Sequence, residues 1–80
     1  MFTVIMENAR GIMPPHHAKS AKSAYMFASL VMGDKKHKVT ITDDASGCEV
    51  CKADGMGVWM DHIFLAQVQR EFKEWYDGEE

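Results

Sequence analysis

The fold of this chain is decided by residues 36–60, which read KHKVTITDDASGCEVCKADGMGVWM. Apolar and polar residues alternate in its first third, where Val39 and Ile41 point one way and the threonines the other, as in a half-buried β-strand. Turn residues follow twice, at Asp43–Gly47 and at Asp54-Gly55. The stretch therefore predicts a three-strand antiparallel meander, with strands near residues 36–42, 48–52 and 56–60.

A strand and a loop precede this meander. The first residues alternate in a two-residue period that predicts another strand, with Phe2, Val4 and Met6 on one side and Thr3, Ile5 and Glu7 on the other. Residues 8–17 contain Gly11 and the Pro14-Pro15 pair, which interrupt regular structure. We therefore expect a connecting loop there.

Two helices complete the chain. A helical period runs over residues 18–32 and stops at Gly33-Asp34, and its apolar face comprises Ala21, Ala24, Tyr25, Phe27, Ala28, Val31 and Met32. The last helix is predicted from His62 to about Tyr76, with Asp61 as its N-cap. Its apolar stripe is predicted to contain Leu65, Val68, Phe72, Trp75 and Tyr76, with Phe64 on the margin.

The predicted architecture is a single α+β domain over residues 1–80. The element order is strand, helix, three-strand meander and helix. Such elements pack most simply as two layers, with both helices on one face of a mostly antiparallel sheet. The other face of the sheet is then open to solvent or to a partner.

Composition and charge narrow the class of protein. The chain has 80 residues, of which 46% are hydrophobic and 26% charged, as in ordinary globular domains. Twelve acidic and nine basic side chains give a net charge of −3, whereas nucleic-acid binders usually carry a basic excess. A small nucleic-acid-binding or regulatory module using the lysines of the first half stays an alternative, as does a phage structural or assembly protein.

The absence of two sequence signals predicts the cellular location of the protein. No run of about 18 apolar residues is present, so we expect no membrane span. The first residues lack the positively charged segment with which an export signal begins, and the chain holds only two cysteines. The expectation is a cytoplasmic protein with free thiols.

No catalytic apparatus is recognisable, so the chain is predicted not to be an enzyme and to need no cofactor. It contains no nucleophile elbow and no glycine-rich phosphate loop. The carboxylate pair Asp43-Asp44 falls in a predicted turn, which favours a solvated role.

Cys48 and Cys51 form a C-x-x-C motif, the spacing found in zinc and thiol redox sites. There is no second pair, and the motif falls inside a predicted strand. Alternation then places Cys48 inward beside Val50 and Cys51 on the open face. The sequence therefore favours free cysteines without metal, with a metal-dependent structural module as the alternative, because no recognised ligand spacing connects the cysteines to His16, His17, His37 or His62.

Trp59 is the strongest candidate for contact with a partner, since tryptophan is enriched in interface hot spots. If Val58 joins the core with Met56 and Met60, Trp59 lies on the open face near Thr40 or Thr42. The other register buries Trp59 and exposes Val58. The predicted contact residues are Trp59, Thr40 and Thr42, with Leu30 and Met26 on the outer side of the first helix, and Lys19 and Lys22.

Residues 18–52 resemble small phage and mobile-element proteins. The resemblance rests on Ala18–Ala24, on the helix stop at Gly33-Asp34, and on Val39–Asp43 followed by Ser46-Gly47. Among such proteins, the anti-CRISPR inhibitors are similar in size, acidity and single-domain α+β build.

This resemblance implies a non-enzymatic inhibitor in the cytoplasm of a host bacterial cell. The inhibitor would bind a CRISPR effector complex of the Cascade type and sterically block target-DNA binding or nuclease recruitment. That family shares no binding motif, so it assigns no residue here. A homodimer through an exposed strand edge is a further open alternative.

Overall fold

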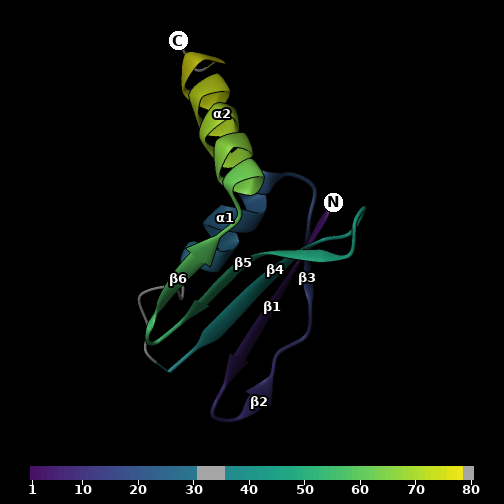
Figure 1. Cartoon of the computed structure of the whole chain (residues 1–80), viewed down its shortest axis with the longest axis vertical. Helices are drawn as coiled ribbons and strands as arrows, with labels where there is room; N and C mark the ends of the chain where they lie inside the picture. The colour runs from purple at the N-terminus through teal and green to yellow at the C-terminus, as the bar shows by residue number, and fades with distance from the viewer. Residues whose placement is uncertain (31–35, 79–80) are drawn as a thin grey trace.

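The computed structural model describes residues 1–30 and 36–78, which form six strands and two helices (Figure 1). The predicted α+β class is confirmed: the helices pack on one face of an antiparallel sheet. The strands are β1 (Phe2–Asn8), β2 (Gly11–Ile12), β3 (His16–Ala18), β4 (Lys38–Asp43), β5 (Cys48–Asp54) and β6 (Gly57–Met60). The helices are α1 (Ala21–Ser29) and α2 (His62–Gly78).

The strands are ordered β2-β1-β4-β5-β6, and β3 also pairs with β1. The predicted meander is therefore confirmed as β4–β5–β6, and β1 joins it beside β4. The expectation of a loop over residues 8–17 was wrong in part, because β2 and β3 both pair with the outer edge of β1. Backbone groups along that edge need hydrogen-bond partners, and the Pro14-Pro15 pair divides the returning chain into two short strands.

The core lies between the sheet and the helices. Val4 and Ile41 are opposite each other on β1 and β4 and are fully buried. Ala21, Ala24 and Ala28 of α1 are also fully buried, because side chains this small let the helix backbone approach the sheet. At one end of the core, the rings of Phe2 and Phe64 meet edge-on with centroids 5.4 Å apart.

Helix α1 is shorter than the predicted span of residues 18–32. Ala18 belongs to β3, where it pairs with Phe2, and the Ser20 hydroxyl caps α1 by accepting from the Ser23 N–H. The helix therefore begins directly after the Ser20 cap, although the helical period of the sequence already begins at Ala18. The predicted face residues Val31 and Met32 and the stop at Gly33-Asp34 lie outside the described residues.

Helix α2 buries part of the predicted stripe, because Val68 and Phe72 pack in the core as predicted. Phe64, expected on the margin, is buried with Val68, whereas Leu65 is 37% exposed and Trp75 40% exposed. The stripe is rotated because α2 packs mainly beside α1 rather than flat on the sheet, as the edge-on contact between Tyr25 and Phe72 illustrates. The side chain of Tyr76 lies outside the described residues.

A β-bulge in β5 corrects the prediction for the two cysteines. Ile41 pairs with Cys51 but Thr42 pairs with Glu49, so Val50 is an extra residue in its strand. Val50 and Cys51 are consequently both buried although they are adjacent, and Cys48 is exposed. The expectation of an outward Cys51 was wrong, because the bulge breaks the alternation on which it depended. Cys48 lies on the same side as Val50, as predicted, but it is exposed rather than buried.

The N-cap of α2 provides a test of this packing. One carboxylate oxygen of Asp61 accepts the N–H groups of Ile63 at 3.0 Å and Phe64 at 3.3 Å. Asp61→Ala should therefore lower the free energy of unfolding by about 1 kcal/mol, measured by urea denaturation. Asp61→Asn keeps a side-chain acceptor and should lose much less. Equal stability of the alanine variant and the wild type would contradict this role of the cap.

Candidate protein-binding face

One face of the sheet is covered by no described helix or loop, and we call it the open face. Its central row crosses four strands in register: Ile5 on β1, Thr40 on β4, Lys52 on β5 and Trp59 on β6. Directly paired residues in antiparallel strands point to the same side, and the neighbours Val39 and Ile41 point into the core. The row thus spans about 15 Å at the usual strand spacing.

Trp59 is the dominant apolar side chain of this row and is 52% exposed. The structure places it on the open face, as in the first of the two predicted registers. Val58, however, does not join the core: it is 54% exposed, and Met56 lies in a turn, almost fully exposed. The reason is that β6 is an edge strand, and only its last residue, Met60, packs against the described core.

The charges on the open face are paired rather than of one sign. The Lys52 ammonium lies 3.2 Å from the Glu49 carboxylate, and Lys38 is directly opposite Glu7 on the neighbouring strand. At the end of the face, the Thr3 hydroxyl donates a 2.6 Å hydrogen bond to Asp44. A mixed surface of this kind suits a protein partner better than a row of phosphates.

The structure separates the predicted contact residues into two groups. Thr40, Thr42 and Trp59 share the open face. Met26 on α1 and Leu30, the C-cap of α1, are exposed but lie on the opposite layer of the domain.

Of the two predicted lysines, Lys22 lies away from the open face. Lys19 follows β3 at the start of the connection to α1. Lys22 lies on α1 with its ammonium 4.7 Å from the centre of the Trp75 ring, so part of its role is to pack against α2. A rigid partner seated on the open face would therefore not contact Lys22.

The sequence prediction missed two members of the row, Ile5 and Lys52. The period of the first strand already grouped Ile5 with Thr3 and Glu7, away from the core residues, so this signal was available. The position of Lys52 beside Trp59 depends on strand register, which the sequence pattern alone does not fix.

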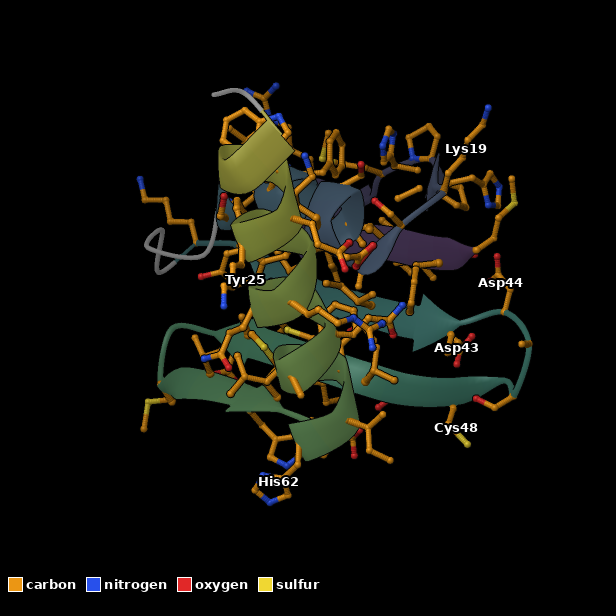
Figure 2. The ribbon with its side chains drawn as sticks, turned by 90° about the horizontal axis from the view of Figure 1, so that it is seen from above. Lys19, Tyr25, Asp43, Asp44, Cys48 and His62 are labelled. Carbon is orange, nitrogen blue, oxygen red and sulfur yellow. The ribbon has the colours of Figure 1, made fainter. Side chains whose placement is uncertain are left out.

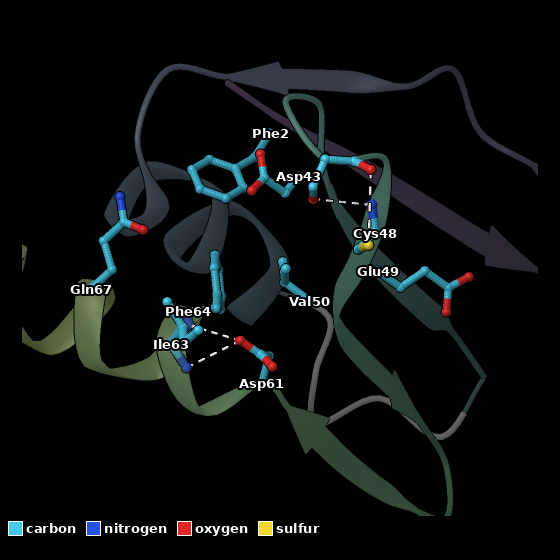
Figure 3. Close-up of a pocket in the computed structure, with 10 residues that line it drawn as sticks. Phe2, Asp43, Cys48, Glu49, Val50, Asp61, Ile63, Phe64 and Gln67 are labelled. Atoms are coloured by element: carbon cyan, nitrogen blue, oxygen red, sulfur yellow. Dashed lines mark hydrogen bonds between the residues drawn. The ribbon is translucent and has the colours of Figure 1, made fainter.

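A cavity of about 200 Å³ lies on the other side of the sheet, between the bulge of β5 and the start of α2 (Figure 3). Its wall includes Phe2, Val50 and Phe64, and Asp43, Cys48 and Asp61 supply polar atoms. Figure 2 shows Asp43, Asp44 and Cys48 at the same end of the sheet. The Asp61 carboxylate is already engaged by the first N–H groups of α2, which limits what it can offer a ligand.

The two cysteines have opposite environments. Cys51 is fully buried, and burial raises the pKa of its thiol from 9.0 to about 11. A neutral buried thiol is a poor nucleophile and a poor metal ligand. Within residues 1–30 and 36–78, no group of three or more His, Cys, Asp or Glu side chains is arranged to hold a metal ion.

Comparison with known proteins gives no relative: the chain matches no protein-family model, no curated protein and no solved structure. In the described part of the chain, neither helix has the length and apolar character required to cross a membrane. The functional argument therefore rests on the geometry of the open face.

Thiol labelling should distinguish the two cysteines. Under native conditions we expect one fast-reacting thiol per chain, from exposed Cys48, and a second only after denaturation. Cys48→Ser should remove the fast phase, as measured with a chromogenic disulfide reagent. Two thiols reacting equally fast in the native protein would show that Cys51 is not protected.

The raised pKa of Cys51 also predicts a pH dependence of stability. The folded state holds the thiol proton more tightly than the unfolded state. The Cys51 thiol therefore contributes fully to the free energy of unfolding below pH 9.0, and this contribution is lost as the pH rises to about 11. The loss should be roughly 2–3 kcal/mol. Cys51→Ala is the control. The free energies of unfolding of the two proteins, measured by urea denaturation, should converge over this pH range. A constant difference between them would contradict the assignment.

Proposed function

We propose that this domain is a non-enzymatic, protein-binding inhibitor that contacts its target through the open face. The observation that carries the proposal is the row Ile5, Thr40, Lys52 and Trp59, in which a half-exposed tryptophan lies on a sheet face covered by no described element. Large aromatic side chains in such positions contribute strongly to binding when a partner removes them from water. The domain would act by occupying a surface that another macromolecule needs.

The chemistry of the row supports a protein target. Trp59 and Ile5 provide apolar contact, Thr40 provides a hydroxyl group that donates and accepts, and Lys52 is paired with Glu49. Of the lysines expected to serve nucleic acid, Lys22 lies on α1 against Trp75, and Lys38 lies on the open face directly opposite Glu7. The face is therefore balanced in charge, whereas phosphate recognition needs a basic surface.

The target that we propose is a CRISPR effector complex of a bacterial host, of the Cascade type. This choice comes from the resemblance of residues 18–52 to small phage inhibitors, and the small acidic α+β build is compatible with it. Inhibition would be steric, through a block of target-DNA binding or of nuclease recruitment. No cofactor and no bond-forming step is part of this mechanism.

Binding of the purified domain to purified effector complexes tests the proposal. Trp59→Ala should weaken binding by about 2 kcal/mol, or roughly thirtyfold in Kd, because the ring is the main apolar contact. Leu30→Ala is the matched control: Leu30 is 77% exposed on the helical layer, and its removal should change Kd by less than about twofold. Biolayer interferometry measures both, after circular dichroism has shown that the variants are folded.

Three results would count against the proposal. If the wild type neither binds an effector complex nor protects a targeted phage in cells, the anti-CRISPR version is wrong. If Leu30→Ala or Met26→Ala weakens binding and Trp59→Ala does not, the contact surface is the helical layer. Binding that disappears with salt and requires nucleic acid would instead favour the nucleic-acid-binding alternative.

A further inference from the structure

The two edges of the sheet are differently protected. At one edge, β1 is covered by two short strands separated by Pro14-Pro15, and such interruptions discourage pairing with another chain. At the other edge is β6, which reads Gly57-Val58-Trp59-Met60 and carries no charge and no proline. Among the described residues, no strand pairs with its outer side.

The hydrogen-bonding direction of β6 follows from its pairing with β5. The Asp61 N–H donates to the Val50 carbonyl at 2.9 Å, so this position points toward β5. In an antiparallel ladder the direction alternates along the strand, so Trp59 and Gly57 also point toward β5. The backbone N–H and C=O groups of Val58 and Met60 therefore point outward, along the free edge.

We infer that β6 is a self-association edge, at which a second copy of this chain adds its own β6 in antiparallel orientation. With the two-fold axis at Trp59, Val58 of one copy faces Met60 of the other, and the same pair forms on the opposite side of the axis. All four outward residues then exchange backbone hydrogen bonds. The two sheets become one continuous sheet across the interface.

The side chains agree with this register. Trp59 lies opposite Trp59 of the second copy on the open face, in a non-hydrogen-bonded pair, where side chains come closest. On the helical side, half-exposed Val58 meets the partly buried Met60 of the second copy. No ionisable side chain lies between Gly57 and Met60, so pairing the strand with itself sets no like charges opposite each other.

The size of this interface sets its strength. Four residues per copy, with one large aromatic side chain, bury on the order of 1,000 Å² or less in total, which is the range of weak, reversible association. A micromolar dissociation constant is therefore expected, and the dimer should form and dissociate with concentration. The inference concerns the edge of the sheet and does not depend on the proposed inhibitor function.

Sedimentation equilibrium of the full chain tests the inference. The mass should rise from 9.1 kDa toward twice that value as the concentration increases through the micromolar range. Val58→Pro removes an outward N–H without removing a bond to β5, and Val58→Lys keeps the N–H but adds a charge at the edge. Each variant should raise the dimer Kd by about tenfold or more.

Ile12→Lys is the matched control. Ile12 is 70% exposed on β2, at the other edge, and its replacement should leave the dimer Kd unchanged. A wild type that stays monomeric up to about 300 µM would overturn the inference, and β6 would then be available to a strand of another protein. A dimer that persists in both Val58 variants, or that only Ile12→Lys dissociates, would also overturn it. Because all these variants retain Trp59, the result is separate from the binding test of the open face.

Discussion

The pairing of β1 with β4 is the constraint on which the rest of the structure depends. It joins the first strand of the chain to the meander and places Val4 opposite Ile41, both fully buried. The three alanines of α1 pack over the sheet around this pair, so the position of α1 depends on where the two strands meet. The same register sets Ile5 opposite Thr40 on the other face. A shift by one residue would exchange the core and the open face.

The bulge at Val50 is the second decisive feature, because it adapts the meander to the last helix. It lets Val50 and Cys51 both point into the core, and the Val50 carbonyl accepts the N–H of Asp61 at the end of β6. Asp61 then caps α2 and directs Phe64 onto Phe2. A single extra residue thus connects the end of the sheet to the start of α2, and it also determines which cysteine is accessible.

The open face and the free edge of β6 meet at Trp59. The open face exists because both helices lie on one side of the sheet. The free edge exists because the sheet ends in β6, a short strand without charged residues. Because α2 packs beside α1, it leaves Val58 and Trp59 of β6 half-exposed on the two faces of the sheet. If the chain dimerises through β6, two open faces become one continuous surface with a pair of tryptophans at its centre, so the two proposals are geometrically compatible.

Much of the fold was determined by the sequence itself. Two-residue alternation located β1 and β4, turn residues located the meander, and Asp61 marked the start of α2, because each of these signals acts between near neighbours in the chain. The short strands β2 and β3, the bulge and the rotated stripe of α2 were not predictable in this way. They depend on which edge needs partners and on how the helices pack against each other. For the candidate site, the sequence predicted Trp59, Thr40 and Thr42. Only the tertiary structure decided that these residues share the open face with Ile5 and Lys52, and that Leu30 and Met26 lie on the other layer. The reason is that strand register and layer order are long-range properties.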